Sequence, residues 1–242
     1  MAARAQSQST KKTRTAVRPF PGYSKKGHTW LRQIEKNNNR DWFQAQKPVF
    51  EEEVKAPTEA LVESLSAKLE AFAPDYVPAD PKKAVMRIYR DTRFSKDKSP
   101  YKTQMGVKFG KAGGGPMDCA GFWFAVSGKQ VDVVGGSYAP GGPQLKALRG
   151  YLDEHHKELE KLLKRKPLRD AMGELQGETL KRVPRGFDPE HPAGELLKQK
   201  QFYLHTTLPA KVITTPDLQK EILRRFKLML PFVELLNDAI QS

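Results

Sequence analysis

The stretch CAGFWFAVSGKQVDVV, residues 119–134, decides the fold class of this chain. Two runs of aromatic and β-branched residues are joined through Gly128 and Lys129, a pattern that predicts a β-hairpin. Side chains alternate along a strand, so Phe122 faces one side of the sheet and Trp123 the other. Because both sides carry large apolar groups, we expect this strand to be covered on both faces. The hairpin therefore predicts a sheet in the middle of the chain with helices over it.

Patterns on either side of the hairpin complete the expected architecture. Strands are predicted at residues 85–89, 104–109 and 202–208, in addition to the hairpin strands at 119–126 and 130–134. Apolar residues at helical spacing predict helices at residues 28–36, 50–72, 143–163 and 215–240. The strands cluster centrally and the helices flank them, so we predict an α+β fold: a mainly antiparallel sheet of about five strands, packed by helices from the N-terminal, middle and C-terminal segments.

Two prolines interrupt the second helical pattern. Pro48 and Pro57 each remove a backbone donor, so we expect a helix start or kink near Pro48 and a kink or junction near Pro57.

The composition indicates a basic globular protein. Lys and Arg exceed Asp and Glu by 14, and half of this excess lies between Met1 and Gly27, where no acid occurs. We expect residues 1–19 to form a basic, disordered arm and residues 20–242 to form one domain. Such a charge favours anionic partners, including nucleic acid.

The sequence also carries signals of location. No window approaches the roughly 18 apolar residues of a membrane span, and the N-terminus lacks the apolar core of a secretory signal. A single cysteine, Cys119, rules out an intramolecular disulfide and fits a reducing compartment. We expect a cytoplasmic protein; in a eukaryote, the Arg-rich, acid-free N-terminus would instead indicate an organellar transit peptide.

The segment RIYRDTRFSKDKSPYK, residues 87–102, is called the arginine loop below. It places six cations and two aspartates between two predicted strands, without helical spacing. Ordered loops of this length are uncommon and usually functional, and we expect Phe94 and Tyr101 to anchor this one on the core. Because two aspartates cannot balance six cations, we predict a site for an anionic small ligand, phosphate or carboxylate.

Two other interpretations remain open. The loop and the basic arm together would also suit the phosphate backbone of RNA or DNA. Alternatively, the loop is a structural network in which Asp91 and Asp97 clamp arginines and no ligand is involved.

In the ligand interpretation, each polar side chain of the loop has a role. The arginines would hold the anion, a lysine and a tyrosine would add a charge and a hydroxyl, and a polar cluster at a helix boundary would join them; these residues are Arg87, Arg90, Arg93, Lys98, Tyr101, Asn38 and Arg40. Asp91 would orient a guanidinium.

The sequence does not decide whether the protein is an enzyme. Asp91 and Asp97 are the acid–base candidates, but carboxylates among cations should have a lowered pKa and be poor acids near neutrality. No nucleophile stands with a base and an orienting residue, and no metal site or cofactor is indicated.

Several spaced elements resemble a known bacterial family. In the arginine loop they are Arg87, Arg90, Asp91, Arg93, Phe94, Asp97, Lys98 and Tyr101. NNNRDWF at residues 37–43, GGSYAP at 135–140 and PRGFDPEHP at 184–192 follow the same family's pattern in order. The chain is similar, from about Phe20 to its C-terminus, to the family called domain of unknown function 2461. The resemblance implies kinship and no particular activity.

Overall fold

The computed structural model of the chain describes residues 19–114 and 118–241. All but the last residue of the expected basic arm, residues 1–19, lies outside the described residues, so its predicted disorder stays a prediction.

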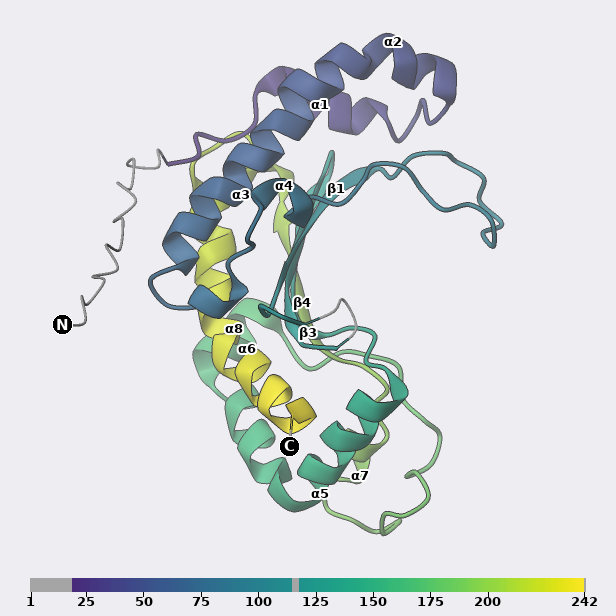
Figure 1. Cartoon of the computed structure of the whole chain (residues 1–242), viewed down its shortest axis with the longest axis vertical. Helices are drawn as coiled ribbons and strands as arrows, with labels where there is room; N and C mark the ends of the chain where they lie inside the picture. The colour runs from purple at the N-terminus through teal and green to yellow at the C-terminus, as the bar shows by residue number, and fades with distance from the viewer. Residues whose placement is uncertain (1–18, 115–117, 242) are drawn as a thin grey trace, which may run out of the picture.

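A single antiparallel sheet lies at the centre of the described residues, with its strands in the order β1-β2-β3-β4 (Figure 1). The strands are β1 (Gln104–Gly110), β2 (Gly121–Ser127), β3 (Gln130–Ser137) and β4 (Phe202–Pro209). Gly128 and Lys129 connect β2 to β3, so the predicted hairpin is confirmed. The hairpin occupies the two central positions of the sheet, and β4 returns from far along the chain to pair with β3.

The prediction of about five strands is slightly wrong, because the structure has a four-stranded sheet. The segment at residues 85–89 forms only two isolated bridges, Val85 with Val107 and Tyr89 with Tyr101. Its β-branched and aromatic residues favour a strand, but only Val85 and Tyr89 pair with a neighbouring segment as residues of a sheet do. The segment therefore leaves the edge of the sheet as one arm of the arginine loop.

The helices surround the sheet as the fold class requires. The N-terminal elements are α1 (Lys25–Gln33), α2 (Arg40–Phe50), a π-helical turn η1 (Glu51–Lys55), α3 (Ala56–Leu69), the 3₁₀ turn η2 (Pro74–Tyr76) and α4 (Pro81–Ala84). The later elements are α5 (Gly142–Leu163), α6 (Lys166–Met172), α7 (Gly194–Leu197), the 3₁₀ turn η3 (Ala210–Val212) and α8 (Asp217–Gln241). The α+β architecture is confirmed.

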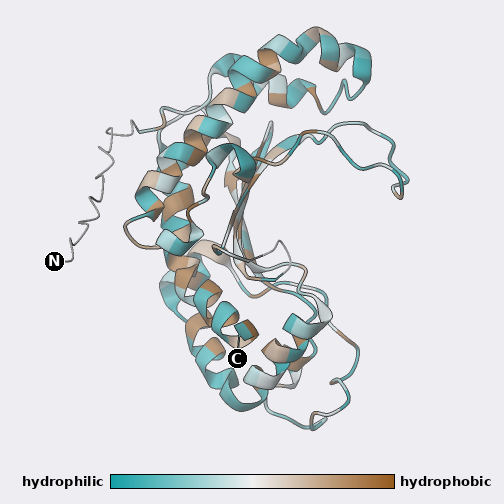
Figure 2. Cartoon of the chain, in the orientation of Figure 1, coloured by the Kyte–Doolittle hydropathy of each residue, from teal (hydrophilic) through white to brown (hydrophobic). Residues whose placement is uncertain are grey.

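One face of the sheet is packed and the other is open. Helix α8 packs against β2 and β3, and α3 packs on α8 on the same side (Figure 1). Helix α5 also packs on α8 and runs below the sheet in this view. Hydrophobic residues recur along α3 and α8, whereas the arginine loop is mostly hydrophilic (Figure 2). On the packed side Phe109, Phe122 and Phe124 point into the core and are fully buried. The expectation that β2 is covered on both faces is therefore wrong.

The reason lies in the side chains of the open face. Glycines, Lys108, Asp132 and His205 alternate with the buried residues and offer little apolar surface for a helix to cover. Trp123, which suggested a second apolar face, is only half-buried on this side, as are Val134 and Tyr203. A helix is held on a sheet mainly by the apolar area that it buries there, and the open face offers too little apolar area to hold one.

The two prolines act at different points of one long helical segment. Pro48 lies inside α2, which begins at Arg40 after the Asn39 side chain accepts the Trp42 amide at 2.9 Å. Pro57 follows the π-helical turn, so the predicted junction is confirmed. Because Pro57 has no amide hydrogen and its ring crowds the carbonyl of Glu53, the π turn moves that carbonyl outward.

Candidate functional site

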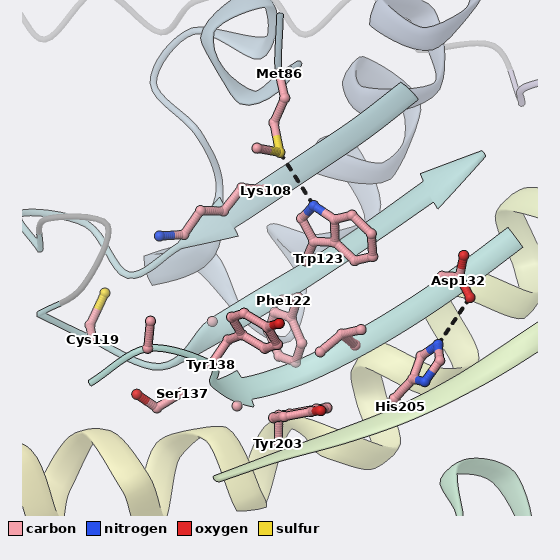
Figure 3. A pocket seen from close by; sticks show the side chains of 14 residues that line it. Met86, Lys108, Cys119, Phe122, Trp123, Asp132, Ser137, Tyr138, Tyr203 and His205 are labelled. Atoms are coloured by element: carbon pink, nitrogen blue, oxygen red, sulfur yellow. Dashed lines mark hydrogen bonds and ion pairs between the residues drawn. The ribbon is translucent and has the colours of Figure 1, made fainter. Parts of the chain in front are cut away.

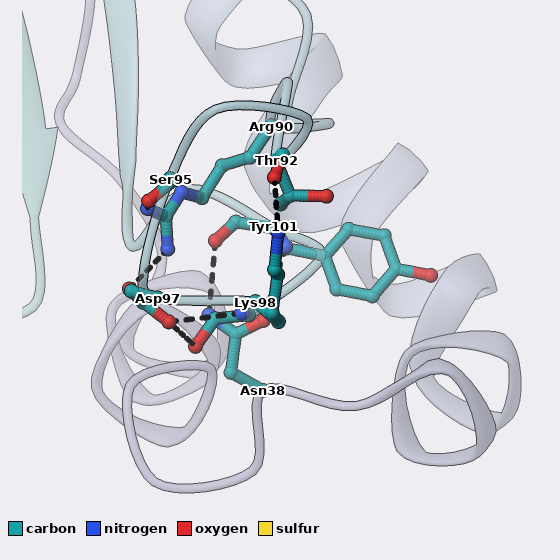
Figure 4. A network of polar contacts seen from close by, with 8 residues as sticks. Asn38, Arg90, Thr92, Ser95, Asp97, Lys98 and Tyr101 are labelled. Atoms are coloured by element: carbon teal, nitrogen blue, oxygen red, sulfur yellow. Dashed lines mark hydrogen bonds and ion pairs between the residues drawn. The ribbon is translucent and has the colours of Figure 1, made fainter.

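The arginine loop is a paired ribbon tied to the turn between α1 and α2. The Arg90 amide donates to the Pro100 carbonyl at 2.9 Å, and the Lys102 amide donates to the Ile88 carbonyl at 2.7 Å. Asn38 uses both ends of its amide on Tyr101: its nitrogen donates to the Tyr101 carbonyl at 2.9 Å, and its oxygen accepts the Tyr101 amide at 3.1 Å (Figure 4). The base of the loop is therefore held by specific hydrogen bonds.

One of the two predicted aromatic anchors is confirmed and the other is wrong. Tyr101 is 2% exposed and its ring stacks on Phe43, with centroids 4.0 Å apart. Phe94 is 95% exposed and lies against only the guanidinium of Arg93, 5.7 Å from its ring centroid. The loop carries its tip outward, where the core cannot reach.

Two of the three arginines are occupied by aspartates of the same loop. Arg90 forms an ion pair with Asp97 and also reaches the Ser95 hydroxyl at 3.4 Å (Figure 4). Arg93 donates to Asp91 through Nε at 3.0 Å and Nη2 at 2.8 Å. The Arg93 side chain is 76% exposed, where such a pair contributes little to stability, whereas that of Arg90 is 25% exposed.

The third arginine has no such partner. Within residues 19–114 and 118–241, neither Arg87 nor Lys102 forms an ion pair, and the same holds for Arg40. Burial, with a smaller contribution from the positive charge of Arg87, lowers the pKa of Lys102. Arg87 is close enough to Asp91 for its charge to help lower the pKa of that carboxyl, but Arg93 is the direct partner of Asp91. Two neighbouring cations that repel each other and form no ion pair of their own are an electrostatically favourable place for an anion.

Lys98 and the aspartates serve the loop itself. The Lys98 amine donates to the Thr92 carbonyl at 2.9 Å, across the tip of the ribbon. Hydrogen bonds from Ser99, followed by the one from Arg90, hold the pKa of Asp97 far below its ordinary value. Arg93 lowers the pKa of Asp91 in the same way. Both carboxylates are ionised at neutral pH and are poor proton donors, as expected from the sequence.

A polar hollow of about 500 Å³ lies at the base of the arginine loop; it is called the cationic hollow below. Its lining residues come from the α1–α2 turn, the ribbon and the start of β1: Glu35, Asn38, Arg90, Asp97, Ser99, Tyr101, Lys102, Thr103 and Gln104. Both acids in this set are already paired, Glu35 with Lys129 at 2.6 Å and Asp97 with Arg90. Lys102 is therefore the lining cation that has no acidic partner among the described residues.

A second cavity, of about 610 Å³, lies on the open face of the sheet; it is called the sheet cavity below (Figure 3). Side chains of the sheet, of Met86 and of the segment after β3 line it: Met86, Lys108, Cys119, Trp123, Asp132, Val134, Ser137, Tyr138, Tyr203 and His205. Sequence reasoning missed this site because it assigned Trp123 to packing. The available signal was the alternation of polar residues and glycines with the buried residues of each strand.

The polar groups of the sheet cavity form a specific pair. His205 Nε2 lies 3.0 Å from Asp132 Oδ1, on neighbouring strands (Figure 3). Trp123 Nε1 donates to the sulfur of Met86 at 3.4 Å. A Cβ on Gly106 would lie 3.2 Å from this indole nitrogen, so the glycine makes room for the Trp123 ring to lie across the sheet.

The described residues contain no group of three or more His, Cys, Asp or Glu side chains that could hold a metal ion. Cys119 is a buried thiol that forms no disulfide, and it lies beside the sheet cavity. In the same part of the chain, no helix is both long and apolar enough to cross a membrane.

Comparison with known proteins places the chain in a family. A family model described as "Conserved hypothetical protein (DUF2461)" matches residues 27–235. The chain belongs to this family. The match includes the arginine loop, the whole sheet and most of α8, so the cationic hollow and the sheet cavity both lie within the family's region. Among curated proteins, none matches the chain.

Proposed function

We propose that this member of the DUF2461 family binds a small anionic molecule, carrying a phosphate or a carboxylate, at the base of the arginine loop. The observation that carries the proposal is the pair of neighbouring cations, Arg87 and Lys102, neither of which forms an ion pair with a carboxylate among the described residues. An anion between them would replace repulsion with two charge-assisted hydrogen bonds.

The loop residues then fall into two groups. Arg90 lines the cationic hollow and is held in place by Asp97, so it contributes a positioned guanidinium. Arg93 and Asp91 pair at the exposed part of the loop and do not line the hollow. The ligand site proposed here is therefore Arg90 and Lys102, which line the hollow, together with Arg87, which lies outside the lining but whose charge acts on Lys102. This is a narrower set than the sequence suggested.

Thermal unfolding in the presence of anions tests the proposal. An anion present at ten times its Kd stabilises the native state by about 1.4 kcal/mol, which for a chain of this size raises Tm by about 3–5 °C. We expect inorganic phosphate, a nucleoside monophosphate or a dicarboxylate to produce such a rise. Arg87→Gln and Lys102→Gln should each abolish it.

Arg93→Gln is the matched control, because it removes one positive charge from the same loop outside the hollow. A rise of equal size in Arg87→Gln and in the wild type would refute the site. If no anion raises Tm and Arg90→Ala alone unfolds the protein, the loop is a structural ion network.

Nucleic acid is a second candidate, favoured by the excess of 14 positive charges and its concentration near the N-terminus. The phosphate backbone of RNA or DNA carries the same chemistry as the small ligand. Binding of this kind weakens steeply with salt, and deletion of residues 1–18 should weaken it further. Binding that ignores both salt and the deletion would exclude it.

A further inference from the structure

The sheet cavity has aromatic side chains on two sides of a row of glycines, two of which, Gly121 and Gly136, line it together with Phe122 and Val134. Gly110, Gly121 and Gly136 lie in register across β1, β2 and β3. On one side the Trp123 ring extends over Gly106, as described above. Beyond the glycines, the rings of Tyr138 and Tyr203 contact each other with centroids 5.2 Å apart (Figure 3). This is the shape of a slot for a flat ring.

The aromatic walls remain accessible in the protein. Tyr138 is 63% exposed, and Trp123 and Tyr203 are half-buried on the side of the sheet that no helix covers. Accessible aromatic faces that converge on a cavity of several hundred Å³ are typical of sites that take small cyclic ligands. Flat rings, including nucleobases, stack on such faces in proteins that bind single strands.

At the polar end, the cavity offers hydrogen-bond acceptors. Asp132 Oδ1 already receives His205 Nε2 at 3.0 Å and Gln130 Nε2 at 2.9 Å. Because a carboxylate only accepts, His205 donates through Nε2; in the tautomer that carries a single proton on Nε2, Nδ1 is an acceptor. Asp132 Oδ2 and His205 Nδ1 have no other partner among the described residues. A ligand that satisfies them must carry hydrogen-bond donors, N–H or O–H, and on a flat aromatic ring an amino group supplies them.

We propose that the sheet cavity binds an amino-bearing heteroaromatic ring, namely a nucleobase, either as a free nucleoside or nucleotide or within a single strand. The ring stacks against Trp123 and Tyr138, and its amino group donates to the pair formed by Asp132 and His205. This inference goes beyond the anion site, because the sheet cavity and the cationic hollow share no lining residue.

Nucleosides test the sheet cavity alone, because they carry no phosphate for the arginine loop. We expect adenosine, cytidine or guanosine to bind the full chain in ligand-observed NMR and calorimetry. Purine riboside differs from adenosine only by lacking the amino group. One hydrogen bond to an ionised or paired acceptor changes a dissociation constant by about tenfold. Adenosine should therefore bind about tenfold more tightly than purine riboside.

Substitutions of residues that line the sheet cavity show where the nucleoside binds. Asp132→Asn replaces one acceptor with a donor of the same shape, so it should bring adenosine and purine riboside to within about twofold of each other. Trp123→Leu should remove nucleoside binding. Tyr138→Ala, at an exposed position whose loss leaves the core intact, should weaken it about tenfold or more by the usual scale of base stacking. Phe94→Ala removes an exposed aromatic ring outside the cavity and should change nothing.

A single strand of ten deoxyadenosines distinguishes the two sources. Binding at least a hundredfold tighter than adenosine, and weakened by Tyr138→Ala, assigns the site to a strand; similar affinities assign it to a free nucleoside or nucleotide. The proposal is overturned if none of the three nucleosides binds at millimolar concentration and strand binding is unchanged in Trp123→Leu and Tyr138→Ala. Equal binding of adenosine and purine riboside by the wild type also overturns it.

Discussion

Replacing Asn38 with alanine tests whether the arginine loop is held in place by one side chain. The Asn38 amide joins the α1–α2 turn to the ribbon through two hydrogen bonds with the Tyr101 backbone, at 2.9 and 3.1 Å. Alanine removes both, and the stack of Tyr101 on Phe43 remains. The substitution therefore loosens the ribbon without opening the core.

The size of the effect follows from the two bonds. A hydrogen bond within a protein contributes about 1 kcal/mol net, so Asn38→Ala should cost about 2 kcal/mol of local stability. That cost corresponds to roughly a 30-fold rise in the population of the opened loop. Because few contacts of the core depend on Asn38, the cost falls on local opening rather than on global unfolding.

Native-state hydrogen exchange measures this opening. The amides of Arg90 and Lys102 are hydrogen-bonded across the ribbon and should exchange about 30-fold faster in Asn38→Ala. Amides of β2 and β3 should be unchanged. Asn38→Ala should also lower the affinity of the cationic hollow for phosphate, because the loop spends less time in the closed conformation that forms the hollow.

Asn37→Ala is the matched control, since the neighbouring amide donates to the Gln33 carbonyl at 3.0 Å within the end of α1 and does not touch the loop. Unchanged exchange at Arg90 and Lys102 in Asn38→Ala would show that other contacts hold the ribbon. An acceleration shared equally by the central strands would show that Asn38 supports the whole fold instead.

Two further predictions concern the packed side of the sheet. The buried Asn237 side chain bonds the Ala120 amide at 2.8 Å, the Ala120 carbonyl at 3.2 Å and the Tyr76 hydroxyl at 2.9 Å. Asn237→Leu leaves these three groups without a partner, so chemical denaturation should show a loss of about 3 kcal/mol or more in the free energy of unfolding. A loss under about 1 kcal/mol would show that the three bonds contribute little to stability. Glu221 pairs with the buried Arg225, and this pair lowers the pKa of Glu221 below its ordinary value of 4.5. The ionised Glu221 therefore stabilises the folded protein fully above pH 4.5, and this contribution is lost as the pH falls through the lowered pKa. The difference in unfolding free energy between wild type and Glu221→Gln should therefore shrink below pH 4.5, and a difference that grows there would reverse the assigned sign.

Local patterns were sufficient for the central hairpin and for the junction before Pro57. The hairpin in residues 119–134 follows from alternation and a glycine-containing turn, which are properties of neighbouring residues. The junction before Pro57 follows from the missing amide hydrogen of that residue. The segment at 85–89 shows the limit of this reasoning, because its residues favour a strand but form only two isolated bridges, Val85 with Val107 of β1 and Tyr89 with Tyr101 of the arginine loop.

The arginine loop could be identified from its charge, but the ion pairs within it could not be predicted. Charge counting showed too few acids for the cations, and the structure leaves Arg87 and Lys102 without an acidic partner among the described residues. Which arginine each aspartate takes depends on how the ribbon folds back, since Arg90 reaches across to Asp97 whereas Arg93 turns to Asp91, two residues away.

The α+β class, the central hairpin and the position of the charged loop follow from composition and short-range periodicity, so the amino-acid sequence is enough to predict them. The sequence gives no means to predict that the described helices leave one face of the sheet open, or that Asp132 meets His205 on that face. The physical reason is that periodicity separates the two faces of a strand but does not say which face the helices cover. That choice depends on the apolar area each face can bury with elements far away in the chain.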